Sequence, residues 1–252
     1  MNSSPADGAR LSSLRPPMTF LEHLVELRSR IIKSLLAVAV GMSLSYFLFE
    51  ERVFEWALLP LAGRELMYLG IAEAFTIHLL FALYLGFVIA LPVVAYQAWA
   101  FVSPGLYPRE RSAAVKLATV STLLFLLGAA FGYFLLMPVA VKFFLSYESA
   151  NLKYGGALEP YLKLFAGILI GSGLCFQMPL VMIGLMKAGI LSARSASEQR
   201  GYWILGIAIL SALLTPTGDV MTQLLLAVPM WILFESAILY MRMTAIGAKN
   251  PA

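Results

Sequence analysis

Long apolar segments alternate with short polar ones along the chain, and their apolar residues do not alternate in the way of strands. Six apolar runs emerge, because a membrane-spanning helix needs about 20 residues. We therefore predict an all-α integral membrane protein with six transmembrane helices. The predicted spans are residues 31–49, a stretch inside 74–108, 113–138, 164–186, 201–214 and 220–240.

The same pattern predicts the domain organisation. A polar amino-terminal tail (1–18) precedes the membrane domain (19–243), and a short carboxyl-terminal tail follows (244–252). The acidic segment 50–73 is expected to form a cap over the helix bundle and to serve as a scaffold.

Composition excludes a water-soluble globule. The chain is 60% hydrophobic and 13% charged, whereas a soluble domain carries about 25% charged residues. The single cysteine, Cys175, excludes an intrachain disulfide. A net charge of +4 would suggest an anionic partner for a soluble protein, but here the placement of the charges matters more than their sum. We expect membrane lipid as a partner and no nucleic acid.

Positive residues indicate the orientation, because Lys and Arg concentrate on the cytoplasmic side of membrane proteins. Thirteen of the eighteen fall in the amino-terminal segment, alternate loops and the carboxyl-terminal tail: Arg10, Arg15, Arg28, Arg30, Lys33, Arg109, Arg111, Lys116, Lys187, Arg194, Arg200, Arg242 and Lys249. The other five lie among acidic residues. We therefore predict that both termini are cytoplasmic.

The last two spans are expected to be short. Tyr202 to Leu214 would measure about 20 Å as a helix, against roughly 30 Å of hydrocarbon. The turn-rich residues 215–219 follow and predict an external hairpin that contains Pro216 and Asp219. Such a hairpin would thin the bilayer locally. In the alternative, residues before Gly201 extend the helix and nothing is thinned.

The inventory of nucleophiles and bases disfavours an enzyme. His23 and His78 are the only histidines, and together with one distant cysteine they give no zinc-binding spacing. The sequence has no phosphate-binding glycine loop and no G-x-S-x-G or H-E-x-x-H motif. No catalytic residue, cofactor or metal is therefore expected.

Two acidic residues stand out within the positive segments. Glu26 lies in an amphipathic entry to the first span, and Glu110 lies in a proline-punctuated loop that begins at Phe101. Their own arginine neighbours would simply neutralise them in one reading. In the other, both carboxylates face one cytoplasmic surface and each binds a guanidinium group bidentately. The residues alone leave both readings open.

Three motifs resemble the TatC family, the multispanning core subunit of the twin-arginine protein translocase. They are HLVELRSRI at 23–31, LPVVAYQAWAFVSPGLYPRER at 91–111 and LLTPTGDVMTQLLLAVPMWILFE at 213–235, and the resemblance covers residues 19–243 in order. It implies an inner-membrane receptor for signal peptides with consecutive arginines, which exports folded proteins using the proton motive force. It further implies single-span partner subunits of the TatA and TatB type, and we expect a homo-oligomer in the active complex.

The resemblance also implies a recognition site. The family's two arginine-binding glutamates fall on Glu26 and Glu110. Residues of the same two motifs complete the candidate signal-peptide site: Leu24, Arg28, Phe101 and Pro104.

One position departs from the family pattern. The family usually has a glutamate in an F-E-x-P context in the fourth span, whereas this chain has Gln177 between Phe176 and Pro179. Gln177 keeps the hydrogen-bonding capacity but cannot titrate, so we expect it to contact a partner helix. Alternatively, it satisfies a backbone carbonyl freed by Pro179. Glu235, the remaining acid within a span, receives no assigned role.

Two other function classes compete with a receptor. A small secondary transporter would bind its substrate at mid-membrane between repeats. No convincing repeat relates residues 31–137 to 164–241, and mid-span ionisable residues are nearly absent. A membrane-embedded enzyme ranks third.

The charge asymmetry makes a topological prediction. In a Cys175→Ser background, single cysteines near Arg15, Tyr107, Ser195 and Ala248 should react with an impermeant reagent only from the cytoplasm. Cysteines near Arg64, Asn151 and Thr217 should react only from outside. Reversed labelling at any two sites would contradict the six-span arrangement.

Overall fold

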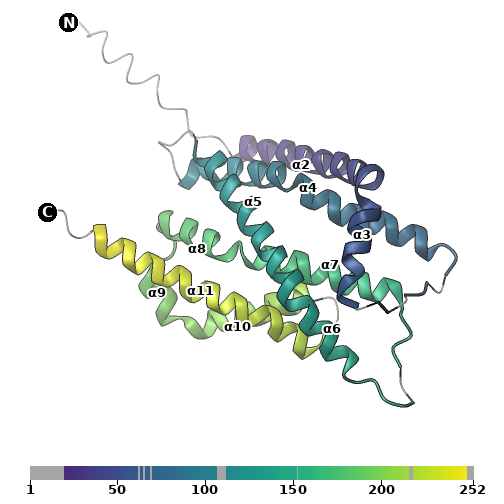
Figure 1. Ribbon diagram of the computed structural model, residues 1–252. Coiled ribbons are helices and arrows are strands. Elements are labelled where there is room, and N and C mark those ends of the chain that lie inside the picture. Colours follow the sequence, from purple (N-terminus) through teal and green to yellow (C-terminus); the bar gives the residue numbers. More distant parts are fainter. Residues whose placement is uncertain are drawn as a thin grey trace, which may run out of the picture.

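The structure is a computed structural model, and it describes residues 20–61, 63–64, 66–68, 70–106, 112–151, 153–215 and 218–248. These residues form a bundle of long helices with short helices at its ends (Figure 1). The elements are α2 (Phe20–Leu48), α3 (Glu50–Leu58), η1 (Leu59–Leu61), α4 (Glu73–Leu106), α5 (Ala113–Phe131), η2 (Gly132–Leu136), α6 (Met137–Leu145), α7 (Leu158–Cys175), α8 (Met178–Lys187), α9 (Ala193–Glu198), α10 (Arg200–Leu214) and α11 (Val220–Ala248).

Within the described residues, five helical segments are long and apolar enough to cross a membrane: Leu21–Leu48, Glu73–Ser103, Ala113–Leu145, Leu158–Lys187 and Val220–Met243. The apolar helix α10 has 15 residues, or about 22 Å, so the fifth apolar segment is short, as the sequence predicts. The all-α membrane fold is confirmed.

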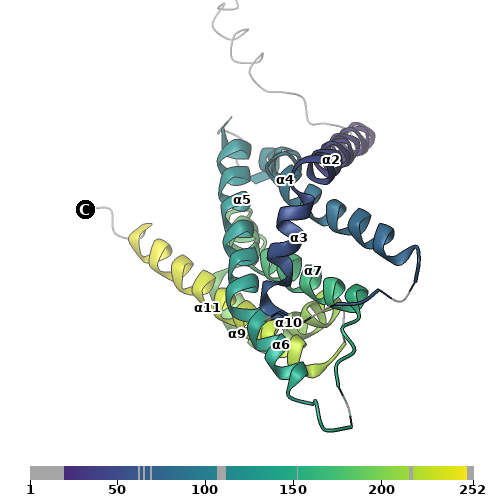
Figure 2. The same cartoon turned by 45° about the vertical axis from the view of Figure 1, so that its right-hand side comes forward.

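Successive long helices run in opposite directions. In Figure 1 the starts of α2 and α5 and the ends of α4, α8 and α11 lie toward the left, and α3 lies at the opposite end. Figure 2 shows the same bundle from a second angle, with α2 and α4 side by side and α10 and α11 adjacent. The side of the membrane that each end faces stays a prediction.

The third span is longer than the sequence pattern suggested. The prediction ended it at Pro138, but the helical path continues through η2 and α6 to Leu145. Pro138 lies in the first turn of α6, where a missing backbone N–H costs least. The π-helical turn η2 just before it absorbs the change in the hydrogen-bonding pattern.

The fourth span is broken rather than continuous. α7 ends at Cys175 and α8 begins at Met178, with Phe176 and Gln177 between them. Pro179 is the second residue of α8 and has no N–H to donate to the carbonyl of Cys175. The break therefore places Gln177 at the junction of two helices instead of inside one.

The expectation of a short sixth span was wrong. α11 has 29 residues, and its membrane-length part runs from Val220 to Met243. Nothing in the sequence stops the helix after Tyr240, because no proline or cluster of turn residues follows before Ala248. A short α10 is thus paired with a full-length α11.

The segment after α2 packs across one end of the bundle, which agrees with the expected cap. The hydroxyl of Tyr133 donates to the carbonyl of Trp56 at 3.0 Å, and that of Tyr161 donates to the carbonyl of Ala57 at 2.6 Å. These carbonyls belong to the last turn of α3, where acceptors lack the regular N–H partner four residues on; that of Trp56 also accepts the backbone N–H of Leu59. Two tyrosines from different helices therefore fix the cap.

An ion pair joins the cap segment to the loop after α6. Arg64 donates to both carboxylate oxygens of Glu148, at 2.6 and 2.9 Å. The guanidinium of Arg64 and the backbone N–H of Tyr154 lower the pKa of Glu148 from its ordinary value. The carboxylate thus stays ionised at neutral pH and holds two loops at the same end.

Small residues set the distance between α2 and α4. A Cβ built at Gly86 would lie 2.3 Å from the backbone nitrogen of Met42, and one at Gly41 would lie 2.4 Å from the carbonyl oxygen of Gly86. The two backbones are therefore in direct contact, which is the way small residues allow membrane helices to pack.

We predict that Gly86→Ala lowers the free energy of unfolding by about 1–3 kcal/mol, because the new methyl group has only backbone to displace. The measurement is the thermal unfolding midpoint of the detergent-solubilised protein. Gly206→Ala is the matched control, since a Cβ at Gly206 meets nothing within 4 Å. Equal midpoints for the two variants would contradict close packing at this crossing.

Candidate functional site

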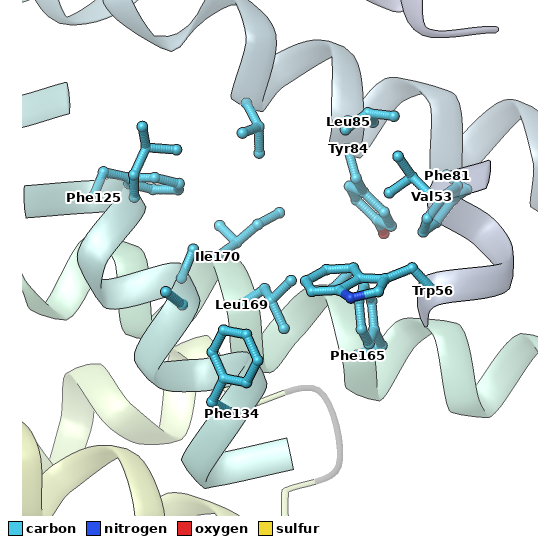
Figure 3. Close-up of a pocket in the computed structure, with 15 residues that line it drawn as sticks. Val53, Trp56, Phe81, Tyr84, Leu85, Phe125, Phe134, Phe165, Leu169 and Ile170 are labelled. Atoms are coloured by element: carbon cyan, nitrogen blue, oxygen red, sulfur yellow. The ribbon is translucent and has the colours of Figure 1, made fainter. Parts of the chain in front are cut away.

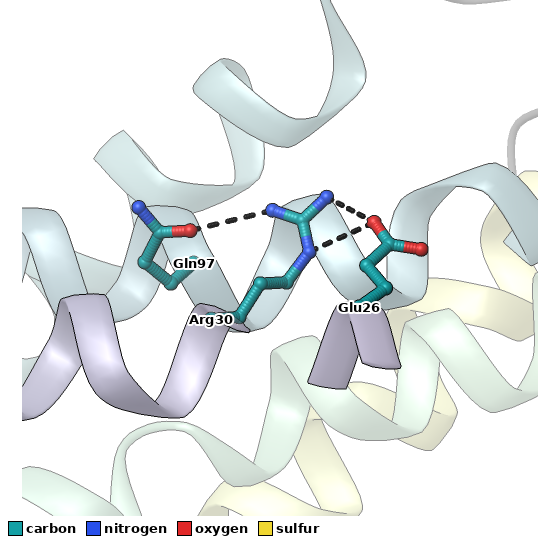
Figure 4. Close-up of polar contacts among 3 residues, drawn as sticks. All are labelled: Glu26, Arg30 and Gln97. Atoms are coloured by element: carbon teal, nitrogen blue, oxygen red, sulfur yellow. Dashed lines mark hydrogen bonds and ion pairs between the residues drawn. The ribbon is translucent and has the colours of Figure 1, made fainter. Parts of the chain in front are cut away.

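Glu26 lies where the start of α2 passes the end of α4. Its Oε1 accepts hydrogen bonds from two nitrogens of Arg30, one turn further along α2, and the Nε distance is 2.9 Å. Nη1 of Arg30 donates to Oε1 of Gln97 on α4 at 3.4 Å (Figure 4). The three side chains form one polar contact between the two helices.

Aromatic packing supports this polar contact. The rings of His23 and Phe101 stack with their centroids 4.2 Å apart and an interplanar angle of 18°. His23 is one turn before Glu26, and Phe101 is one turn after Gln97 on α4, so the stack lies beside the polar contact. The structure therefore brings Phe101 close to Glu26, as the sequence predicts.

Other predicted members of the site are not brought to this contact. Leu24 and Arg28 are exposed, and each is two residues from Glu26, or about 160° away around the helix. They therefore face away from Gln97. Pro104 lies in the last turn of α4, and its side chain is not among those described.

Glu110 lies outside the described residues, as does the loop 107–111 that carries it. The separation of the two glutamates is therefore not part of the described geometry. The pairing of Glu110 with Glu26 stays a prediction.

The ion pair between Glu26 and Arg30 is partly exposed. The side chains of Arg30 and Glu26 expose 21% and 24% of their surface, so water and a peptide can both reach them. Arg30 uses one oxygen of Glu26, and no partner for Oε2 is recorded within the described residues. A carboxylate accepts hydrogen bonds on both oxygens, so this one retains capacity for a second donor.

Gln177 is paired within the chain. The hydroxyl of Ser121 on α5 donates to Oε1 of Gln177, and Nε2 of Gln177 donates to the carbonyl of Ser121 at 3.0 Å. The acceptor is therefore on another helix, and it is not the carbonyl that Pro179 frees. Gln177 is half-buried, and its contact with a partner helix stays a prediction.

Two further acidic residues have structural contacts. Glu235 binds Arg200 through both of its oxygens, at 2.7 and 2.9 Å, and this bidentate pair joins α10 to α11. Oδ1 of Asp219 accepts the backbone N–H of Thr222 at 2.8 Å and caps the first turn of α11. Pro216, the other predicted hairpin residue, lies outside the described residues.

Sequence reasoning missed four residues of these contacts: Arg30, Gln97, Ser121 and Arg200. Arg30 was available as the basic residue four positions after Glu26, a spacing that favours ion pairs in helices. Gln97 and Ser121 gave no signal, because each is an uncharged polar residue within a largely apolar helix and its partner comes from a distant segment.

An apolar cavity of about 260 Å³ lies between the cap and the middle of the bundle (Figure 3). Among its 15 lining side chains, only Tyr84 and Trp56 carry a polar atom. A polar or charged substrate needs convergent polar groups in its site, and this lining does not supply them. In addition, no group of three His, Cys, Asp or Glu side chains that could hold a metal is found among the described residues.

Comparisons with known proteins agree in fold and sequence. The family model described as "Sec-independent protein translocase protein (TatC)" matches residues 22–229. A protein of that name from Desulforapulum autotrophicum is 36% identical over 87% of this chain and 83% of its own length. Another from Aquifex aeolicus is 36% identical over 88% of this chain and 93% of its own.

The fold has also been solved in a related protein. The crystal structure of a "Twin Arginine Translocase Receptor- TatC" superposes with a TM-score of 0.79 and 34% sequence identity. The match covers 89% of this chain and all of the solved chain. The likeness therefore extends over most of the chain.

Proposed function

Because this chain belongs to the TatC family of Sec-independent protein translocase proteins, we propose that it is the signal-peptide receptor of its translocase. It binds signal peptides that carry consecutive arginines on folded cargo. The proton motive force drives export across the bacterial inner membrane, where the chain is multi-pass with both termini in the cytoplasm. The protein itself catalyses no chemical reaction.

The observation that carries this proposal is that Glu26 already binds a guanidinium group. Its carboxylate is partly exposed and lies at the end of the bundle where the positively charged segments gather. A guanidinium donates in a fixed planar fork that a carboxylate matches and that an ammonium group cannot reproduce. A site for arginine rather than lysine follows from this chemistry.

A second glutamate fits the ligand. Two consecutive arginines need at least two acceptor groups with fixed geometry. Glu26 is one of them, and Glu110, in the loop that follows α4, is the second. Glu110 is placed here by its position in the family motif alone.

A small secondary transporter is less well supported. The cavity of Figure 3 has no charged lining residue. The carboxylates of Glu26, Glu148 and Glu235 are bound by arginines near the ends of the bundle. A transporter of a polar substrate needs ligands near the middle of the membrane.

The size of the cargo requires partner subunits. A folded domain of 100 residues has a radius of gyration of about 13 Å, whereas the cavity measures about 260 Å³. The passage therefore forms between this chain and others. We propose single-span subunits of the TatA and TatB type, together with further copies of this chain, and assign Gln177 to the contact with a partner helix.

If Glu26 and Glu110 accept the two guanidinium groups, replacing either by Ala should weaken signal-peptide binding by roughly 1.5–3 kcal/mol, the worth of a hydrogen bond to a charged group. Gln at either position should give an intermediate loss. The measurement is the Kd of a labelled twin-arginine signal peptide for the purified chain in nanodiscs.

Glu198→Ala is the matched control for this experiment. Glu198 forms an ion pair with Arg194 at the same i,i+4 spacing as Glu26 and Arg30, but on α9. Its loss should leave peptide binding unchanged. Full export activity in the Glu26→Ala, Glu110→Ala double variant would mean that these acids only neutralise their neighbours.

If Gln177 contacts a partner helix, its side chain has to give up its hydrogen bonds to Ser121 and form new ones to a residue of the partner. Gln177→Leu should then weaken partner association by about 0.6–2 kcal/mol, whereas Ser121→Ala should preserve or strengthen it, because it frees the amide oxygen of Gln177 while the backbone acceptor of Nε2 stays. Gln177→Glu should be tolerated, because a carboxyl held protonated in the membrane still forms hydrogen bonds.

The measurement is cross-linking between the partner helix and a cysteine introduced near position 177, with thermal stability followed in parallel. If Gln177→Leu and Ser121→Ala lower stability equally and neither changes the cross-link yield, Gln177 only joins α5 to the α7–α8 junction.

A further inference from the structure

Arg30 presents to Glu26 the same chemical group as the proposed ligand. Its Nε and Nη2 both donate to Oε1 of Glu26, and its Nη1 donates to Gln97 (Figure 4). All three guanidinium nitrogens are thus engaged at the recognition site. The chain's own arginine therefore occupies one oxygen of the Glu26 carboxylate.

Resting on the receptor function proposed above, we propose that Arg30 is an internal competitor that sets the affinity threshold for peptide arginines. Arg30 holds Glu26 while the site is empty, and a peptide arginine must replace it to bind both carboxylate oxygens. The release of Arg30 is part of every binding event. Its cost raises Kd by a constant factor.

The geometry of the contact allows this exchange. Both donating nitrogens of Arg30 bind the same oxygen of Glu26. In a strong arginine–carboxylate pair, two nitrogens bind two different oxygens, and that fork is not formed here. Oε2 has no recorded partner within the described part of the chain. An incoming guanidinium can therefore bind Oε2 first and take over Oε1 as Arg30 leaves.

Arg30 also has an acceptor to which it can move. Gln97 is neutral, and its 3.4 Å contact with Nη1 is longer than the 2.7–3.2 Å usual for an N–H···O bond. This contact can shorten once Glu26 releases the guanidinium, so the displaced charge is not left without a hydrogen bond. Gln97 belongs to α4, so the exchange also changes the contact between α2 and α4.

The strength of the pair is suited to a threshold rather than a block. Arg30 and Glu26 are about a quarter exposed and lie four residues apart on one helix. Ion pairs of this kind are weak, and their loss changes an equilibrium constant about two- to fivefold. A peptide with two arginines that each bind a carboxylate through two hydrogen bonds gains more binding free energy than the release of Arg30 costs. A ligand with a single weak contact gains less than that cost.

The test compares the Kd of a labelled twin-arginine signal peptide for the full-length chain and its variants in nanodiscs. Arg30→Gln should bind about two- to fivefold more tightly than the unaltered chain. Arg30→Lys, which keeps the charge but loses the planar fork, should tighten binding less. A twin-lysine peptide should tighten by the same factor, because the cost of release is common to all ligands.

Two controls separate release of Arg30 from a general effect of charge. Arg194→Gln removes one positive charge from an i,i+4 pair on α9 and should leave Kd unchanged. In a Glu26→Gln background, Arg30→Gln should also have no effect, since its partner is absent. Equal tightening in both backgrounds would mean simple charge repulsion and would overturn the proposal.

The remaining outcomes distinguish this proposal from the one it rests on. Equal binding by the unaltered chain and Glu26→Ala would overturn the receptor site and the role of Arg30 together. Binding that depends on Glu26 but is unchanged or weaker in Arg30→Gln would overturn only the competitor role. A weaker Arg30→Gln would make Arg30 a positioning residue for Glu26.

Discussion

Hydrocarbon offers no hydrogen bonds, so each polar group that this chain buries has to find its partner within the protein. Among the described residues, no buried side-chain nitrogen or oxygen lacks a hydrogen-bond partner. Several of these bonds join different helices: the hydroxyl of Ser45 donates to the carbonyl of Ala82, and that of Tyr161 donates to Ala57. Gln223 likewise donates to the carbonyl of Ala208 across the pair formed by α10 and α11. The order of the helices in the bundle is therefore tied to a few polar residues at defined depths.

The same requirement decides where the charges lie and how they are used. Two carboxylates near the ends of long helices bind arginines, and the two pairs differ in geometry. Glu235 and Arg200 use both oxygens and join two helices, whereas Glu26 and Arg30 share one oxygen on one helix. The pair of Glu235 and Arg200 has a structural role, because another guanidinium could form no more hydrogen bonds to Glu235 than Arg200 already does. The Glu26 pair leaves one carboxylate oxygen without a partner among the described residues, and the proposed receptor role rests on that free acceptor.

Close backbone packing complements these polar contacts. Gly128 and Gly132 on the third span face Ser172 on α7, and a Cβ at Gly132 would lie 2.2 Å from the hydroxyl of Ser172. This pair of small residues thus packs within the bundle. Together with the crossing of α2 and α4, it brings α4, α5 and α7 around the apolar cavity of Figure 3. The interior is consequently suited to apolar contact, and the proposed recognition residue Glu26 lies near the end of a helix instead.

The sequence by itself determined the class of fold and most helix positions, and it singled out Glu26 as a candidate, because apolar runs, charge placement and motifs are local properties of the chain. Helix ends were less certain: Pro138 does not end the third span, since a proline in a first turn is tolerated. Only the tertiary structure decided that Gln177 pairs with Ser121 and that Gln97 contacts Arg30. Such contacts join residues 56 and 67 positions apart, and their geometry depends on how two helices cross. That crossing is set by the packing of whole helix faces, which no local pattern specifies.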